Sequence, residues 1–351
     1  MGCRLSKKTK IPQKNKIKQI TINDFNIKKK IGVGKFGSVY LVEKKDIKKE
    51  FAMKILNKKK LIQESQVNHA NLENKILSNL NHPFVVKLEC SFQTNNDLFL
   101  IMQYISGGEL YHQMNFIDFF SEDQIRLISA EIILALEYIH SKGIIYRDLK
   151  PENVLLDNSG HIYLIDFGFA KEKNSKSNTF CGTIEYMAPE MLLGKEQGFQ
   201  IDFWSLGCLI YELIHKTPPF YSDNQDNIFK KILKGKFSFS SPASNELKSL
   251  IENLLIIDPD KRLSFSENYQ KNIKNHPFFE GLDWNKVYHK KYQSQIKPFN
   301  EENDLDIDIS FPNQIFKDEK NLQNDLQNDF LLFPEFSYSI NDNNFQNSLS
   351  N

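Results

Sequence analysis

The stretch that decides the fold is Tyr146-Arg147-Asp148-Leu149-Lys150-Pro151-Glu152-Asn153. It holds an aspartate, a lysine and an asparagine at set spacing within one loop. Asp166-Phe167-Gly168 follows, and then Met187-Ala188-Pro189-Glu190, whose glutamate we expect to pair with Arg262 inside a helical lobe. Asn153 and Asp166 offer oxygen ligands without Cys or His, which suits a hard cation such as Mg²⁺. This order of motifs predicts a metal-dependent catalytic loop.

Closer to the amino terminus, Gly32-Val33-Gly34-Lys35-Phe36-Gly37-Ser38-Val39 has the pattern G-x-G-x-x-G-x-V. The glycines let a turn bring its backbone close to phosphate oxygens. Alone, the pattern also fits a plain hairpin or a dinucleotide fold. A dinucleotide fold needs a helix directly after the glycines, but a strand pattern follows and leads to a second strand that ends at Lys54. Lys54 needs a carboxylate partner, and Glu73 on the next helix is the candidate.

With these motifs, the chain from about Phe25 to Phe279 resembles the eukaryotic protein kinases. Within them it is similar to the group of protein kinases A, B and C. The markers are Tyr146, Phe180-Cys181-Gly182-Thr183 and Asn275-His276-Pro277-Phe278-Phe279. Ile184 stands where protein kinase A has proline, a variant shared with the ribosomal-protein kinases, so the subfamily stays open. The resemblance implies transfer of the γ-phosphate of ATP to serine or threonine of proteins.

The resemblance also implies an α+β bilobal fold. We expect a kinase domain over 25–279, with a small antiparallel-sheet lobe and one key helix over 25–104, and a large helical lobe over 105–279. A basic arm, 1–24, precedes it. A regulatory tail, 280–351, follows it and wraps back. After about Gly281 the sequence is rich in Asn, Asp and Lys, which by composition predicts a flexible tail.

Hydrophobic periodicity indicates where elements lie in both lobes. In the small lobe we expect strands around the glycine-rich turn and up to Lys54, a helix and one more strand. In the large lobe we expect three long helices, the first with a capping signal at Ser121-Glu122-Asp123-Gln124. The expected ranges are Phe25 to Val42 for the hairpin, Gln66 to Asn79 for the first helix, Leu98 to Tyr104 for the last strand, and Ile125 to His140, Ile201 to His215 and Asn245 to Ile257 for the later helices.

The resemblance implies a role for each catalytic side chain. Asp148 would accept the proton of the substrate hydroxyl, and Lys150 would neutralise the γ-phosphate. Lys54, held by Glu73, would contact the α- and β-phosphates. ATP would be enclosed by the residues Ile31, Gly32, Val33, Gly34, Lys35, Phe36, Gly37, Ser38, Val39, Ala52, Lys54, the gatekeeper Met102, the hinge residues Gln103, Tyr104 and Ile105, and Glu109.

Acidic residues stand at the positions with which this kinase group reads its peptide substrates. They are Glu109 after two glycines, Glu152 in the catalytic loop and Glu212 after Tyr211. Carboxylates there pair with arginines on the amino-terminal side of the acceptor. We therefore expect basic protein substrates, and we assign Thr183 to the same surface.

Two phosphorylation sites follow from the resemblance. Thr179 lies in the activation segment, and an upstream kinase would phosphorylate it. Its phosphate would be received by His69, Arg147 and Lys171.

The second site is Ser337, within Phe333-Pro334-Glu335-Phe336-Ser337-Tyr338, which matches the hydrophobic motif F-x-x-F-S/T-Y. In relatives the two aromatic rings of this motif dock on the small lobe beside the helix that carries Glu73. Ser310 is a weak candidate for a turn-motif site.

The amino terminus, Met1-Gly2-Cys3-Arg4-Leu5-Ser6, fits the pattern for N-myristoylation at Gly2, with Cys3 as a palmitoylation candidate. Nine lysines follow in the first thirty residues, so two signals for a membrane surface coincide. We find no apolar run as long as a membrane span and no signal-peptide core. We therefore expect a protein at the cytoplasmic face of a membrane, and otherwise in the cytoplasm.

Composition excludes several other classes. Of 351 residues, 40% are hydrophobic and 25% charged, which fits a folded domain with a large core. Lys plus Arg (45) nearly equals Asp plus Glu (44), so no nucleic-acid partner is indicated. The cysteines, Cys3, Cys90, Cys181 and Cys208, include no C-x-x-C pair, which disfavours a zinc site or a disulfide framework.

Two rival functions remain to be weighed against catalysis. A pseudokinase scaffold would need Lys54, Asp148 or Asp166 to be missing, and all three are present. A small-molecule kinase would not need the peptide-reading activation segment or the docking tail. Both features favour a protein substrate.

Overall fold

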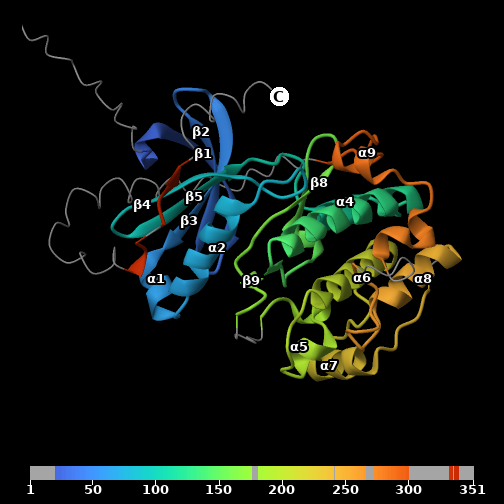
Figure 1. Cartoon of the computed structure of the whole chain (residues 1–351). Coiled ribbons are helices and arrows are strands. Elements are labelled where there is room, and N and C mark those ends of the chain that lie inside the picture. Colours follow the sequence, from blue (N-terminus) through green and yellow to red (C-terminus); the bar gives the residue numbers. More distant parts are fainter. Residues whose placement is uncertain are drawn as a thin grey trace, which may run out of the picture.

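The protein folds into two lobes joined by a short linker (Figure 1). The computed structural model describes residues 20–175, 181–240, 242–265, 272–299, 332–334 and 336–339. The amino-terminal lobe is built on one sheet, and the carboxyl-terminal lobe is mainly helical. None of the helices within these ranges is both long and apolar enough to cross a membrane.

The small lobe holds an antiparallel sheet in the order β1-β2-β3-β5-β4-β10. Phe51, Met53 and Ile55 of β3 point into a buried core, whereas Ala52 and Lys54 lie on the opposite face, as alternation along a strand requires. The strands are β1 (Phe25–Gly34), β2 (Gly37–Lys44), β3 (Lys49–Asn57), β4 (Leu88–Gln93), β5 (Asp97–Gln103) and β10 (Tyr338–Ser339).

The sequence prediction that a strand ends at Lys54 is wrong. Strand β3 continues to Asn57, because Ile55 and Leu56 stay buried and keep their pairing with β5. Lys54 therefore lies within the sheet, with neighbouring strands on both sides. This placement fixes the direction of its side chain more firmly than a strand end would.

Two helices accompany the sheet, α1 (Lys58–Gln63) and α2 (Val67–Asn79). The expected single helix is α2, and its predicted range is confirmed to within one residue, with Gln66 as its N-cap. Helix α1 was not predicted. Asn57 accepts a hydrogen bond from the Lys60 amide (3.1 Å) and so begins this short helix.

The large lobe is centred on α4 and α6, whose apolar residues are almost fully buried. The predicted capping signal is confirmed: the Ser121 hydroxyl accepts from the Gln124 amide, and the Gln124 side chain accepts from the Ser121 amide. The large-lobe helices are α3 (Leu110–Phe116), α4 (Glu122–Ser141), α5 (Pro189–Leu192), α6 (Gln200–His215), α7 (Gln225–Lys234), α8 (Asn245–Leu254) and α9 (Trp284–Tyr288).

Short strands and 3-10 turns complete both lobes. In the large lobe the strands pair as two small ribbons, β6 with β9 and β7 with β8, which border the catalytic loop. The elements are β6 (Ile144–Ile145), β7 (Val154–Leu156), β8 (Ile162–Leu164) and β9 (Lys171–Glu172), with 3-10 helices η1 (Ile22–Asp24), η2 (Pro151–Asn153), η3 (Ile184–Tyr186), η5 (Ile273–Asn275) and η6 (Pro277–Phe279).

Helix α8 ends at Leu254, short of the predicted Ile257. Pro259 follows closely, and a proline disfavours helical conformation in the residue before it. Beyond the helix, the Arg262 guanidinium forms two hydrogen bonds with the Glu190 carboxylate, at 2.6 and 2.9 Å. Both side chains are buried. The predicted pairing of these two residues is confirmed.

The prediction of a flexible tail after Gly281 is wrong for its first part. Residues 281–299 pack on the large lobe, with Val287 and Ile296 buried. Lys290 adds an ion pair with Asp157 (3.1 Å) and lies over the ring of Tyr163. Composition failed here because a few apolar anchors in a polar segment are enough to hold it against an existing surface.

Candidate active site

Asp202, a fully buried residue of α6, holds the catalytic loop in place. Its carboxylate accepts hydrogen bonds from the backbone amides of Tyr146 (3.0 Å) and Arg147 (2.8 Å). It also contacts Nε2 of His140 at 2.7 Å. Arg147 has a left-handed backbone (φ 70°), a conformation that side chains rarely adopt without such support. Asp202 thus fixes the shape of the loop.

Asp148 lies at the centre of this loop and is 5% exposed. The Asn153 amide nitrogen donates to its Oδ2 (2.7 Å) and to its carbonyl (2.8 Å). Lys150 Nζ lies 3.2 Å from the same Oδ2 and donates to the Thr183 hydroxyl at 2.8 Å. The structure therefore brings together four residues that the sequence singled out.

A second cluster joins the two lobes. Lys54 Nζ lies 2.6 Å from Glu73 Oε1 on α2 and 3.4 Å from Asp166 Oδ1. Burial alone would lower the pKa of Lys54, but the carboxylates of Asp166 and Glu73 outweigh it and raise that pKa. The Lys54 ammonium in turn lowers the pKa of Asp166. Lys54 is thus charged and Asp166 ionised at neutral pH.

The glycine-rich hairpin lies beside Lys54, since Val39 of β2 pairs with Lys54 of β3. At Gly37 a Cβ would lie 1.7 Å from the Ile55 carbonyl oxygen, so packing alone demands glycine there. At Gly32 and Gly34 the nearest atoms to a Cβ would be 3.5 and 3.8 Å away, which is ordinary contact. The fold itself does not require glycine at these two positions. Their bare backbone suits the close approach of a phosphate.

The walls of the expected nucleotide site lie around this hairpin and the linker. Several of the wall residues, on β1, β2, β3, β5 and the linker directly after β5, are half-buried. The linker is fixed to the large lobe by hydrogen bonds between Gly107 N and Leu156 O (2.8 Å) and between Leu156 N and Gly108 O (2.9 Å). The half-buried residues include Ile31, Val39, Ala52, Met102, Gln103 and Tyr104.

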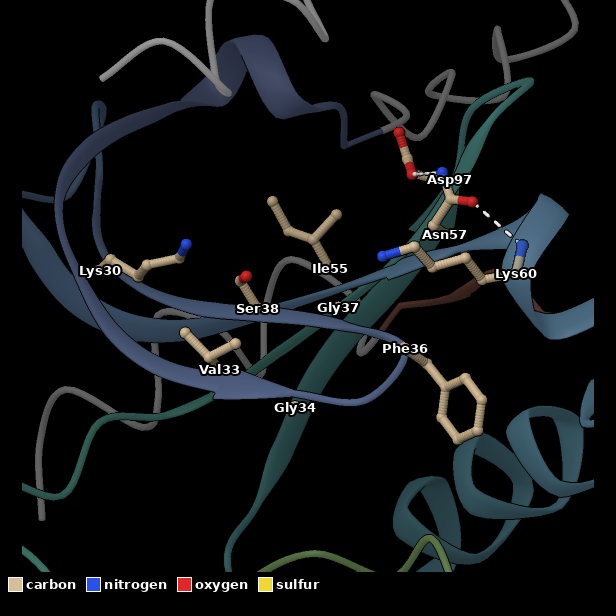
Figure 2. A pocket seen from close by; sticks show the side chains of 10 residues that line it. All are labelled: Lys30, Val33, Gly34, Phe36, Gly37, Ser38, Ile55, Asn57, Lys60 and Asp97. Carbon is tan, nitrogen blue, oxygen red and sulfur yellow. Dashed lines mark hydrogen bonds between the residues drawn. The ribbon is translucent and has the colours of Figure 1, made fainter. Parts of the chain in front are cut away.

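A hollow of about 220 Å³ lies on the hairpin itself. Figure 2 shows Lys30 and Lys60 reaching toward it from opposite sides, with Ser38 and Ile55 between them. Lys54, Asp148 and Asp166 do not line it. We assign this hollow no part in catalysis.

The residues expected to hold a divalent metal fit that task. Asp166 presents an exposed carboxylate next to Lys54 and has a left-handed backbone (φ 57°). Asn153 uses its amide nitrogen on Asp148, which leaves its carbonyl oxygen as a ligand. Carboxylate and amide oxygens are suitable ligands for a hard cation.

The three acidic residues expected to read the peptide form one electrostatically coupled group. Glu109 begins α3, and burial raises its pKa, with the Glu152 carboxylate adding to the rise. Burial raises the pKa of Glu212 to about 7, and Glu152 again adds, whereas a hydrogen bond from the Tyr186 hydroxyl opposes the shift. Glu152 Oε2 is buried and has no hydrogen-bond partner among the described residues. Unlike a surface acid, Glu212 is 5% exposed.

The residues expected to receive a phosphate are close to one another. Arg147 lowers the pKa of both His69 and Lys171, in addition to the lowering by burial. Arg147 also donates to the Phe169 carbonyl (2.6 Å), and so is held beside the Asp166 turn. Thr179 itself lies outside the described residues, as do Gly2, Cys3 and Ser310.

The hydrophobic motif is docked on the small lobe. Phe333 and Phe336 are 0% and 1% exposed. Asn74 of α2 donates to the Phe336 carbonyl (2.9 Å), and Gln93 of β4 donates to the Phe333 carbonyl (2.8 Å). Strand β10 then adds to the sheet edge, and Ser337 before it is exposed. The tail therefore contacts the helix that carries Glu73.

Sequence reasoning missed several residues that shape the site. Asp202, the acid in the first turn of α6, lies among apolar residues of the helix, and this setting is a signal of a buried, bonded carboxylate. Lys58, which is 1% exposed, donates to Gln93 (2.8 Å) and lies over the Phe333 ring. Nothing in the sequence distinguishes Lys58 from the neighbouring lysines.

Comparison with known proteins identifies the class that this fold and site define. The chain belongs to the protein kinase family, whose domain description, protein kinase domain, matches residues 25–279. Its similarities place it in the group of protein kinases A, B and C.

Three relatives show the extent of the similarity. The RAC family serine/threonine-protein kinase homolog of Dictyostelium discoideum is 44% identical over 290 residues, which cover 82% of this chain and 64% of that protein. Protein kinase 3 of the same organism is 39% identical, covering 96% of this chain and 38% of that protein. Serine/threonine-protein kinase gad8 of Schizosaccharomyces pombe is 41% identical, covering 81% and 50%. The chain thus spans between about two fifths and two thirds of the length of these relatives.

Proposed function

We propose that the chain is a serine/threonine protein kinase that transfers the γ-phosphate of ATP to protein substrates with the help of Mg²⁺. The observation that carries this proposal is a pair of clusters: Glu73–Lys54–Asp166, which joins the two lobes, and Asp148–Lys150–Asn153 in the catalytic loop. Lys150 links them, because its charge helps to lower the pKa of Asp166. A scaffold that binds no nucleotide has no need of either cluster. Relatives named serine/threonine-protein kinases support the same activity.

In this proposal each polar group has one task. The ammonium of Lys54 holds the α- and β-phosphates, and Glu73 keeps it in place. The substrate hydroxyl gives its proton to Asp148, its oxygen bonds to the γ-phosphorus, and the bond to the ADP oxygen breaks. Lys150 stabilises the charge on the transferred group. Asp166 and Asn153 would hold Mg²⁺, which would neutralise phosphate charge.

We further propose that the substrates carry arginines before the acceptor residue. Glu109, Glu152 and Glu212 concentrate negative charge beside the catalytic loop, and the buried Glu152 Oε2 has no hydrogen-bond partner within the described structure. A guanidinium can donate two parallel hydrogen bonds to such a carboxylate. Arginine is therefore the side chain that best satisfies this group.

This substrate preference is expected to depend on pH. Because the pKa of Glu212 is raised to about 7, the residue is ionised above pH 7 and neutral below it. The KM for an arginine-bearing peptide is therefore expected to rise roughly five- to tenfold as the pH falls from 8 to 6. Steady-state kinetics with matched peptides, with and without arginines, measure this directly. An arginine-free peptide is expected to show no such rise.

Glu212→Gln provides the control for this pH dependence. Glutamine can still accept the hydrogen bond of Tyr186 but carries no charge. The variant is expected to have a high KM for the arginine peptide at every pH. If wild type phosphorylates both peptides with equal KM at pH 8, the proposed preference is wrong.

Regulation by phosphorylation is part of the proposal. A phosphate on Thr179, added by an upstream kinase, would offset the repulsion between Arg147 and Lys171. Burial and Arg147 lower the pKa of His69, and a phosphate nearby would raise it again and favour the charged imidazole. A phosphate on the exposed Ser337 would strengthen the docking of the tail.

We also propose a lipid anchor at the amino terminus, from the sequence alone. Myristoylation of Gly2, palmitoylation of Cys3 and the lysine-rich arm would together hold the kinase at the cytoplasmic face of a membrane, whereas one myristoyl chain binds only marginally. Mass spectrometry of the native amino-terminal peptide is expected to detect the acyl group on Gly2, and Gly2→Ala is expected to move the protein from the membrane to the soluble fraction. An unmodified Gly2 in the native protein would refute the anchor.

A further inference from the structure

Lys216 has an unusual backbone. It caps the carboxyl-terminal end of α6 with a left-handed conformation (φ 61°), and its amide donates to the Glu212 carbonyl (2.8 Å). Glycine is the residue that this position of a helix normally favours, because a side chain is strained there. The strain by itself assigns no role to Lys216, so the contacts of its side chain decide what it does.

The side chain of Lys216 reaches a different helix. Its Nζ donates to the carbonyl oxygens of Met114 (2.5 Å) and Ile117, at the carboxyl-terminal end of α3, and lies over the Phe120 ring. The last carbonyls of a helix lack partners within it, and a lysine there also compensates the helix dipole. Burial lowers the pKa of Lys216, and the nearby Asp118 carboxylate opposes this shift.

Helix α3 depends on such contacts for its position. It has seven residues, which is too short to be stable alone. Glu109 is its N-cap. Gln113, in the middle of the helix, donates to the carbonyls of Gly107 (3.1 Å) and Phe299 (2.8 Å). These contacts hold the start and middle of α3, while Lys216 holds its end.

We propose that Lys216 is a positioning residue for substrate recognition, which ties the end of α6 to the end of α3 and thereby sets Glu109 relative to Glu212. This inference rests on the proposed reading of substrate arginines by these carboxylates. Glu109 and Glu212 are both coupled to Glu152 between them. A shift of α3 therefore changes the spacing of the carboxylates that two arginines must meet.

Lys216→Gly tests this proposal, because glycine relieves the backbone strain while it removes the ammonium. We expect the KM for an arginine-bearing peptide to rise roughly three- to tenfold, with kcat and the KM for an arginine-free peptide changed less than about twofold. Lys216→Arg keeps a cation at this place and is expected to keep the KM for the arginine-bearing peptide close to the wild-type value. Lys216→Met, which keeps the side-chain stem, provides a second variant with the same expected rise. In a Glu109→Gln background, Lys216→Gly is expected to add little, since the two changes act on one contact.

Lys48→Gly is the matched control. Lys48 is an exposed lysine with a similar left-handed backbone (φ 53°) in the turn between β2 and β3 of the small lobe, whereas α3 belongs to the large lobe. Lys48→Gly is expected to leave the KM values for the arginine-bearing and the arginine-free peptide unchanged. A purely structural role for Lys216 predicts instead that the thermal midpoint, kcat and both KM values worsen together, and that result overturns the proposal.

The positioning role of Lys216 and the preference for arginine-bearing substrates can fail separately. If wild type prefers the arginine peptide and Lys216→Gly keeps its KM, the positioning role is wrong and the substrate preference stands. If wild type shows no preference, the proposed substrate class is wrong and the role of Lys216 falls with it.

Discussion

Asp166→Ala is expected to lower phosphate transfer on the order of 10³-fold, because the variant loses the carboxylate proposed to hold the metal against the phosphates. The fold is expected to survive. The Asp166 side chain is 46% exposed, and Lys54 keeps its closer partner, Glu73, at 2.6 Å. Initial rates with a serine peptide at saturating ATP measure the effect, with the thermal midpoint recorded for each protein.

The control for this variant is Asp223→Ala, which removes an exposed aspartate of the large lobe. It is expected to keep its rate within about twofold of wild type. If Asp166→Ala retained more than about a tenth of the wild-type rate, its proposed role as the main metal ligand would be abandoned.

The second large effect concerns the tail. Phe333→Ala removes a fully buried ring from the docking site on the small lobe, and truncations of this kind cost about 3 to 5 kcal/mol where the ring is part of a core. The tail is expected to leave the surface of α2, to which Asn71 and Asn74 bind it. Because α2 carries Glu73, we expect the rate to fall about tenfold or more.

Hydrogen exchange separates this mechanism from general unfolding. Faster exchange is expected in α2 and at the β4 edge, while α4 and α6 keep their protection. Leu332→Ala is the matched control, since Leu332 lies directly before the motif but is 43% exposed. Full activity of Phe333→Ala would show that the docked tail does not support Glu73.

The sequence predicted the core of the site well because its chemistry is local. Asp148, Lys150 and Asn153 lie in one loop, so their spacing alone brings them together. Lys54 and Glu73 are further apart, but a strand followed by an amphipathic helix constrains where each can point. The predicted contact between them is present in the structure.

What the sequence did not predict depends on tertiary contacts. Asp202 and Lys216 act on backbone groups of other elements, and a backbone carbonyl or amide carries no sequence signature of its own. The packing of residues 281–299 was missed for a related reason. Val287 and Ile296 each find a preformed surface, which neither periodicity nor composition reports.

The most direct test of the central claim is transfer of labelled γ-phosphate from ATP to a serine peptide with upstream arginines. The full chain, phosphorylated at Thr179, is assayed with Mg²⁺, and the labelled residue is identified. We predict labelled phosphoserine in the peptide, and none when Asp148→Ala replaces wild type. No transfer to any serine or threonine peptide by the phosphorylated chain would contradict the assignment as a protein kinase and favour a non-catalytic scaffold.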